Sequence, residues 1–270
     1  MKTSMNWFAA FSLFATLGLL PPISPTYANS TKSQDNVSNP SSEQSMESHW
    51  DYMGIDGPEH WGMLTKEYMT CETGNRQSPI NISMAKHGQQ HNSLVIRYHP
   101  SQVYELNNGH TIQVSHASGC EADLNNRTYK LRQFHFHAPS EHHIEGQAFP
   151  MEMHFVHQDK KGHILVIAVM MKTDSSMPVL EKLWRWLPKQ QGREVSLPLE
   201  FSIADILPTA THHYSYSGSL TTPPCSEGVQ WILLKEPIHI TKEDVEGFRQ
   251  IIGHNARPIQ PRRNRNIEEK

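Results

Sequence analysis

The segment 133–137, QFHFH, places two histidines one residue apart and is the clearest source of chemistry in the chain. In a β-strand, side chains at positions i and i+2 leave the same face, so His135 and His137 can reach one common point. The phenylalanines of this segment leave the opposite face, toward an apolar layer. His154, in a second run of the same kind, can supply a third imidazole from another strand. Three neutral imidazoles with a fourth position left open are the ligand set of a catalytic zinc ion.

The histidines also have polar neighbours at a suitable spacing. Gln133 lies two residues before His135, and Glu152 lies two residues before His154, so each shares a strand face with its histidine. Metal-bound imidazoles usually donate their second N–H to such an acceptor, which fixes their orientation. His157 lies on the other strand face from His154 and is a poor fourth ligand. The alternative is a chance pair, because the chain has 18 histidines.

The first 28 residues have the composition of a secretory signal. Lys2 precedes an apolar run over 7–20, which is followed by two prolines and a small-residue site ending at Ala28. The run is too short for a membrane span and no second stretch approaches that length, so we predict an exported protein without membrane insertion. Residues 29–46 are rich in Ser, Asn and Gln and predict a disordered leader. Residues 47–270 are long enough for one domain with a sizeable core.

Charge and cysteine content narrow the function further. The chain has 24 Lys and Arg against 27 Asp and Glu, and loss of the signal removes only Lys2, which leaves 23 against 27 and a net charge of −4. This balance predicts no binding to nucleic acid or anionic membranes. The arginines of segment 262–265 are interpreted as part of a solvated tail. Three cysteines leave at least one thiol unpaired within the chain, and the sequence alone leaves three pairings open. The odd thiol is either a buried free cysteine, which we favour, or part of an intermolecular bridge.

The rest of the pattern is mostly that of short strands. Residues with β-branched or aromatic side chains between turn signals predict strands at 94–98, 111–114, 164–171 and 229–234, besides the two histidine runs. One helix is predicted over 178–187, behind Ser176 and an N-terminal proline, and another over 241–252, with Thr241 as its cap and Gly253 just past its end. Many strands and few helices predict a mainly β (α+β) fold with one large, predominantly antiparallel sheet.

Nine segments, in order along the chain, resemble the α-class carbonic anhydrases. They are 57–61, 76–81, 106–110, 133–137, 139–142, 152–157, 216–224, 231–237 and 255–258. Such a collinear set, spread from about His49 to Pro261, is highly specific. The resemblance implies a twisted central sheet of about ten strands with short peripheral helices. Ala138 stands where animal members usually carry Trp and is typical of bacterial and plant members, so we expect a bacterial protein of the periplasm, or a secreted one.

The resemblance also implies a catalytic centre. One Zn²⁺ per chain is bound by His135, His137 and His154, with Gln133 and Glu152 as the partners of two of them. The reaction is the reversible hydration of carbon dioxide to bicarbonate and a proton, through attack by zinc hydroxide. Feeble ester hydrolysis at the same site is plausible chemistry for that nucleophile.

The resemblance gives Thr221 the task of orienting the nucleophile. Thr221 is expected to accept the hydroxide's hydrogen and to pass its own to Glu141, because a misoriented nucleophile costs rate steeply. Without the resemblance, Thr221 is an ordinary turn residue before two prolines. Thr222 is expected to line the substrate side.

Further residues acquire roles only through the resemblance. An apolar wall for carbon dioxide is formed by Val156, Val166, Leu220, Val229 and Trp231, of which only Val156 is placed beside the metal by its strand face. His110 matches the proton shuttle, since histidine titrates near neutrality; taken alone it is a surface histidine beside a turn. The polar groups that order the shuttle's waters are Tyr52, Asn108 and Gln113.

The resemblance resolves the cysteine pairing and the assembly in the same way. Cys71 and Cys225 match the disulfide of exported members, which fastens the loop that carries Thr221, and Cys120 is the free thiol. Dimers are common in the bacterial branch, which favours a homodimer. Two alternatives remain: a catalytically silent member acting as a binding module, and a histidine-rich periplasmic zinc buffer without catalysis.

Overall fold

The computed structural model describes residues 49–88, 94–117 and 119–270. All of these belong to one unit, Met46–Lys270. The signal expected at 1–28 and the leader expected at 29–46 lie outside the described residues. Within the described part of the chain, no helix is long and apolar enough to cross a membrane.

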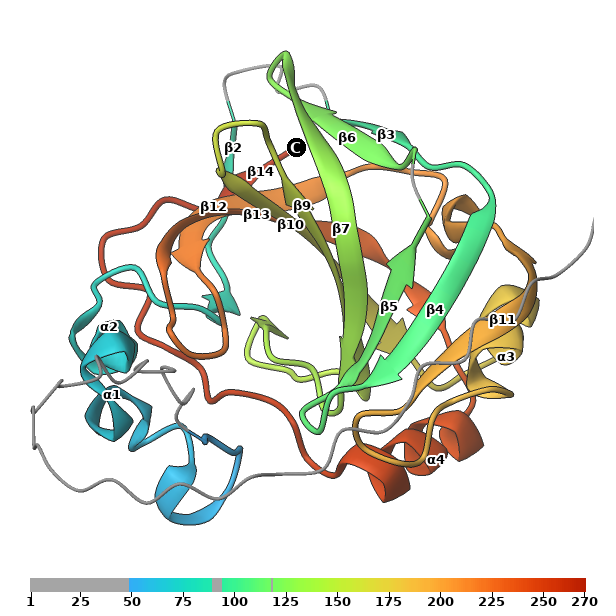
Figure 1. Cartoon of the computed structure of the whole chain (residues 1–270). Coiled ribbons are helices and arrows are strands. Elements are labelled where there is room, and N and C mark those ends of the chain that lie inside the picture. The colour runs from blue at the N-terminus through green and yellow to red at the C-terminus, as the bar shows by residue number, and fades with distance from the viewer. Residues whose placement is uncertain (1–48, 89–93, 118) are drawn as a thin grey trace, which may run out of the picture. The chain divides into compact units, whose positions relative to one another are not determined.

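One large sheet dominates the structure (Figure 1). Ten of its strands follow one path in the order β11-β4-β5-β7-β9-β10-β13-β12-β14-β2, and β3 and β6 pair beside it. Only the β10–β13 and β14–β2 pairs of this sheet are parallel. The mainly β, mostly antiparallel fold is therefore confirmed. The strands span β2 Lys86–His87, β3 Leu94–Arg97, β4 Ser101–Asn107, β5 Ile112–His116, β6 Glu121–Leu124, β7 Arg127–His137, β9 Met151–Gln158, β10 Ile164–Lys172, β11 Glu194–Phe201, β12 His213–Ser219, β13 Glu227–His239 and β14 Glu268–Glu269; a second, two-stranded sheet pairs β1 Asn81–Ile82 with β8 His143–Ile144.

The helices are short, as expected. In α4 the predicted cap is present, because Thr241 Oγ1 accepts a hydrogen bond from Asp244 N (3.0 Å). The predicted helix begins at Pro178, as expected, but it ends at Trp184 instead of Leu187, and no side chain caps its start. Trp184 Nε1 donates to Asp244 O (2.8 Å), which joins α3 to α4 (Figure 1). The helical segments are α1 Trp61–Leu64, α2 Thr70–Thr73, α3 Pro178–Trp184 and α4 Lys242–Ile252, with 3-10 turns at Gly54–Asp56, Lys66–Tyr68 and Ile203–Ile206.

The two faces of the sheet differ in character at its centre. Val114, Phe134, Phe155 and Ile167 pair in a row across β5, β7, β9 and β10, and all four are fully buried in the main apolar core. The residues next along these strands point to the other face. Alternation along the strands therefore turns the histidines away from the core, as the sequence pattern predicts.

The end of the chain differs from the expected solvated tail. Arg262 Nη1 donates to Ser83 O (2.7 Å), and Arg262 and Arg265 each donate from Nε to the other's carbonyl (2.9 Å). Residues Glu268–Glu269 then pair with β12 and β2. The interpretation as a tail was wrong because this segment is held by Ser83 O, 179 residues away, and by strand pairing beyond it, which a charge pattern does not reveal.

Candidate metal centre

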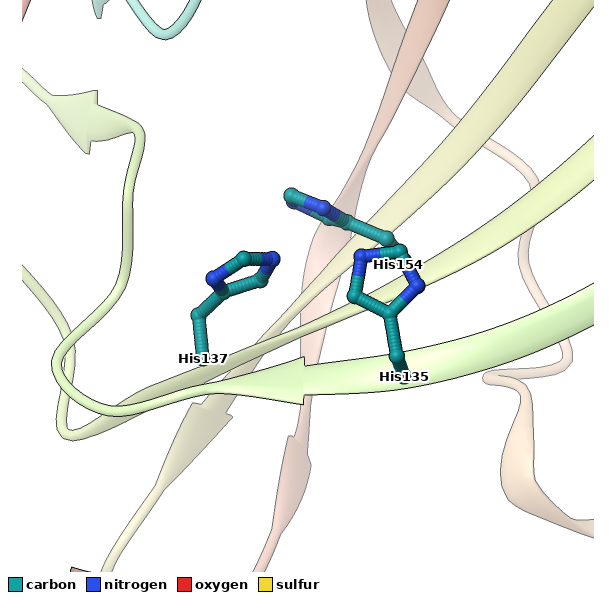
Figure 2. Close-up of side chains that lie close together, drawn as sticks. All are labelled: His135, His137 and His154. Atoms are coloured by element: carbon teal, nitrogen blue, oxygen red, sulfur yellow. The ribbon is translucent and has the colours of Figure 1, made fainter. Parts of the chain in front are cut away.

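Three imidazoles converge on one point above the sheet (Figure 2). His135 and His154 are paired across β7 and β9, and His137 follows on the same face of β7. Their ring centroids are 5.1, 5.3 and 4.6 Å apart. One nitrogen from each ring lies within 4.8 Å of the others, the arrangement needed to hold a metal ion.

Each imidazole is oriented through its other nitrogen. His135 Nδ1 bonds to Gln133 Oε1 (2.8 Å), His137 Nδ1 to Asn255 O (2.7 Å), and His154 Nε2 to Glu152 Oε1 (2.8 Å). Two Nε2 atoms and one Nδ1 atom are thereby left for a ligand. His137 Nε2 is buried and has no hydrogen-bond partner, which is costly unless a metal completes it. The residues present therefore fit a metal ion with three nitrogen ligands.

Burial and charge act in opposite directions on these histidines. Desolvation lowers the pKa of His135 well below its usual value and lowers that of His137 as well, which favours the neutral, metal-binding form. Desolvation also acts on His154, but the carboxylates of Glu152 and Glu141 outweigh it and raise its pKa.

Glu152 is the best-satisfied charged group of the site. It is fully buried, and its two oxygens accept four hydrogen bonds, from Glu141 N, His142 N, His142 Nδ1 and His154 Nε2, at 2.7–2.8 Å. Burial raises the pKa of a carboxyl, but the two imidazoles outweigh that effect and hold the pKa of Glu152 well below its usual value. Glu152 is thus an anion that fixes His154.

Beyond Glu152, a chain of buried hydrogen bonds reaches the loop of Thr221. His142 Nε2 bonds to Tyr216 Oη (2.6 Å), and Tyr216 Oη bonds to Ser78 Oγ (2.8 Å). Ser78 Oγ in turn accepts from Ser219 N (3.1 Å). Sequence reasoning gave no role to four residues of this site, although all lie in or beside the matching segments: Ser78, His142, Tyr216 and Asn255. Their hydrogen-bond partners are 10 to 141 residues away in the sequence, so no local pattern reveals them.

Glu141 points one oxygen at the cluster. Its Oε1 accepts a hydrogen bond from Arg257 N (2.9 Å), whereas Oε2 lies 3.5 Å from His137 Nε2 and 3.9 Å from His154 Nδ1. This Oε2 is buried and accepts no hydrogen bond from any described residue. The expected bond from the hydroxyl of Thr221 is therefore not formed in this structure, although Thr221 is buried, in the loop between β12 and β13.

The five residues expected to form an apolar wall are gathered in one cluster. Val156 pairs with Val166, and Val166 pairs with Trp231, which gives a continuous row across β9, β10 and β13. The ring of Trp231 lies edge-on to His154, with centroids 4.9 Å apart. Val229 is buried in this cluster and Leu220 packs against it. Thr222 is partly exposed, and its carbonyl accepts from Cys225 N (2.8 Å).

His110 lies partly buried at the turn between β4 and β5. Its ring stacks on Trp50, with centroids 3.7 Å apart, and Tyr52 lies edge-on at 6.5 Å. Burial lowers the pKa of His110. Asn108 Oδ1 accepts from His110 N (2.9 Å) and from the next N–H, so its oxygen holds the turn. Gln113 pairs with His135 on the metal face of the sheet. Sequence reasoning did not identify the contact with Trp50.

The expected disulfide is present between Cys71 and Cys225, and Cys120 is a buried free thiol. Cys225 lies four residues after Thr221. Arg257 Nη2 donates to Cys71 O (2.8 Å), so the same arginine whose N–H holds Glu141 also holds the other end of the bridge. The bridge and Arg257 together fix the loop against the metal centre.

Comparison with known proteins decides the family. The model of the eukaryotic-type carbonic anhydrases matches residues 56–270. The chain belongs to this carbonic anhydrase family. The carbonic anhydrase of Pectobacterium atrosepticum is 43% identical over 216 residues, which cover 79% of this chain and 87% of that protein. That of Neisseria gonorrhoeae is 44% identical over 215 residues, covering 79% and 84%.

Solved carbonic anhydrases have the same fold. The α-carbonic anhydrase of Thermovibrio ammonificans matches with a TM-score of 0.79 and 43% identity, over 82% of this chain and 99% of that one. That of Photobacterium profundum matches with a TM-score of 0.78 and 39% identity, over 82% and 100%. This carbonic anhydrase is a carbonate dehydratase that acts on carbon dioxide and bicarbonate, and its buried cluster of three histidines is typical of the family's metal site.

Proposed function

We propose that the metal of this carbonic anhydrase is one Zn²⁺ ion per chain, held by His135 Nε2, His137 Nε2 and His154 Nδ1. The observation that carries the proposal is the orientation of the three rings, each of which uses its other nitrogen in a hydrogen bond. Three imidazoles and no thiolate suit zinc with an open coordination position. Held there, a zinc ion would supply Lewis acidity, which would lower the pKa of a water molecule enough to give a hydroxide nucleophile near neutral pH.

The protein's own residues direct the reaction. The apolar row of Val156, Val166 and Trp231 offers carbon dioxide a site without competing hydrogen bonds, and it borders His154. Glu141 is held by Arg257 N and keeps Oε2 free to accept the hydroxyl hydrogen of Thr221. Thr221 then accepts a hydrogen bond from the nucleophile, which aims its lone pair at carbon. Thr222 lines the same side and takes part in holding bicarbonate.

His110 carries the proton away from the centre. Its partial burial and its lowered pKa favour a neutral ring that accepts a proton and soon releases it to buffer. Stacking on Trp50 holds the ring in one orientation. Tyr52, Asn108 and Gln113 complete a polar path, in which Asn108 contributes its NH₂ group because its oxygen is already used by the turn.

We also propose that the enzyme works outside the cytoplasm, in the periplasm, after cleavage near Ala28. The disulfide between Cys71 and Cys225 supports this location, since such bonds persist in oxidising compartments. A homodimer remains a prediction, to be measured by the mass of the protein in solution.

Stopped-flow hydration of carbon dioxide, with metal content measured on the same samples, tests the proposed centre. His154→Ala should lose its zinc, and its kcat/KM should fall by at least about 10³-fold. The substitution removes a metal ligand and also the imidazole that donates to Glu152. His212→Ala, which removes an exposed histidine, is the control and should keep both. Full hydration activity in zinc-free His154→Ala would refute the zinc site. Several weakly bound zinc ions without activity would instead support a zinc buffer.

The shuttle is tested separately. His110→Ala should lower kcat about tenfold or more in weak buffer and leave kcat/KM nearly unchanged, because proton transfer follows the attack on carbon dioxide. Added imidazole should restore part of the lost turnover. An unchanged kcat in weak buffer would remove His110 from the mechanism without affecting the assignment of the metal ligands.

A further inference from the structure

A basic cleft of about 510 Å³ lies where the start of β7 meets the turn between β9 and β10. We define it by its charged lining residues, which are Arg127, Lys130, Arg132, Asp159, Lys160 and Lys161. Five of the chain's 24 Lys and Arg residues thus surround one cleft, although the whole chain has a net charge of −3. The volume falls within the range of small-ligand sites.

The positive charge of this cleft is largely uncompensated. Lys130, Arg132, Lys160 and Lys161 are exposed, and none of them forms an ion pair with a described acidic residue. The one acid of the lining, Asp159, is already engaged. Its Oδ2 bonds to His163 Nδ1 (2.7 Å) and lies 3.8 Å from Arg127 Nε, and its Oδ1 accepts two backbone N–H groups.

The acids on the neighbouring strand offset the positive charge of the cleft only in part, because Arg97 cancels one of their two negative charges. Glu121 and Asp123 of β6 pair with Lys130 and Thr128 of β7. Both carboxylates are bound by one guanidinium, because Arg97 Nη2 donates to Glu121 (3.0 Å) and Arg97 Nη1 to Asp123 (2.8 Å). The other basic segment of the chain, 262–265, has its guanidinium groups in use, because Arg262 and Arg265 donate hydrogen bonds to backbone carbonyls.

The cleft shares a sheet face with the metal centre but is separate from it. Leu131 pairs with His157 and Gln133 with Val156, so Arg132 is an extra residue in β7. Because of this bulge, Lys130 lies on the metal face of the sheet. It pairs with Gln158, which shares a face of β9 with His154. Gln158 lies four positions after His154 along β9, a distance of about 13 Å. An ion in the cleft therefore does not reach the metal.

We propose that this cleft binds an oxyanion of the phosphate class. Lysine ammonium groups and arginine guanidinium groups are the usual partners of phosphate oxygens, and several of them around one cleft match a ligand with more than one negative charge. The phosphate groups can belong to a free polyphosphate or to a lipid headgroup. The proposal is independent of the zinc chemistry, because neither the cleft residues nor the binding measurement involves the reaction.

Calorimetric titration of the zinc-loaded protein with tripolyphosphate at low ionic strength is the test. Wild type should bind one molecule per chain, and Lys130→Gln/Lys160→Gln should bind at least about tenfold more weakly, because two of five cations are lost. Tripolyphosphate bound at the metal instead of the cleft would keep its affinity in this variant, and such an outcome would overturn the proposal. The matched control is Arg76→Gln/Arg263→Gln, which removes two exposed arginines elsewhere and should leave binding within about twofold.

Co-sedimentation with phosphatidylglycerol vesicles distinguishes the two sources of phosphate. Tripolyphosphate binding that is lost only in the cleft variant supports a free anion as the ligand. Vesicle binding lost only in that variant supports a headgroup. No binding of either probe, or equal weakening in both double variants, overturns the proposal. Carbon dioxide hydration should be unchanged in the cleft variant, which shows that it is folded and keeps the two hypotheses separate.

Discussion

Two fully buried glutamates lie on opposite faces of the same sheet and have opposite properties. Glu152 pairs with His137 on the metal face and accepts four hydrogen bonds. Glu105 pairs with Val114 on the core face, and neither of its oxygens has a hydrogen-bond partner among the described residues. Partners hold the pKa of Glu152 well below its usual value, whereas burial alone raises the pKa of Glu105 to about 8.

The difference shows what burial of an acid requires. A carboxylate inside a protein remains ionised only when donors and positive groups replace the water it has lost. Glu152 has these, and it can therefore orient a ligand as an anion. Glu105 does not, and it is held as a neutral acid near neutral pH. Burial by itself is thus no sign of function, whereas the set of partners is.

The largest expected effect follows from removing the charge of Glu152. Glu152→Gln should weaken zinc binding about 10- to 100-fold, because the amide cannot accept all four hydrogen bonds and no longer attracts His154. Competition with a chelator measures the affinity. Glu105→Gln is the matched control, the same substitution at a buried site of the other face, and should leave zinc affinity unchanged. An equal loss in both variants would mean that general destabilisation is responsible.

A smaller effect is expected one step further from the metal. His142→Phe removes the donor to Glu152 Oε1 and the partner of Tyr216, and we expect a loss of zinc affinity of up to about tenfold with a loss of stability of about 1–3 kcal/mol. His157→Phe is the control, because His157 is equally buried and bonds to Tyr98 (2.7 Å) but has no contact with a ligand. It should reduce stability and leave zinc affinity intact, and any weaker zinc binding there would contradict the specific role of His142.

The effect expected at Glu105 itself is on stability, with no change in zinc affinity, and it depends on pH. Its pKa in the folded protein, about 8, lies above that of the unfolded chain, so its contribution to stability is present at low pH and is lost as the pH rises toward 8. Urea unfolding should therefore show Glu105→Gln gaining on wild type between about pH 5 and pH 8.5, by about 2–4 kcal/mol at the upper end. A stability difference that does not change with pH would show that Glu105 has an unseen partner.

Local patterns explain why much of the site could be predicted. Gln133, His135 and His137 share a face because alternation is a property of any strand, and Thr241 caps α4 through a bond only three residues long. The disulfide between Cys71 and Cys225 followed only from the family resemblance, since three pairings were open. Such predictions depend on neighbours in the sequence or on motifs already known.

The rest could not be predicted because its partners are distant in the sequence. Asn255 O orients His137 across 118 positions, and Arg257 N holds Glu141 across 116. Helix propensity does not predict that the helix from Pro178 ends at Trp184. The charge pattern does not predict that Arg262 donates to the carbonyl of Ser83. The bulge at Arg132, which brings Lys130 to the metal face, is likewise set by pairing with β9.

The sequence by itself determined the chemistry of this protein: which three imidazoles meet, that Gln133 and Glu152 accompany two of them, and which family uses that set. Only the tertiary structure decided how the site is held, through Asn255, His142 and Arg257, and where positive charge is left without a partner. The physical reason is that strand periodicity acts over two residues, whereas burial and hydrogen bonding depend on which distant segments the fold packs together.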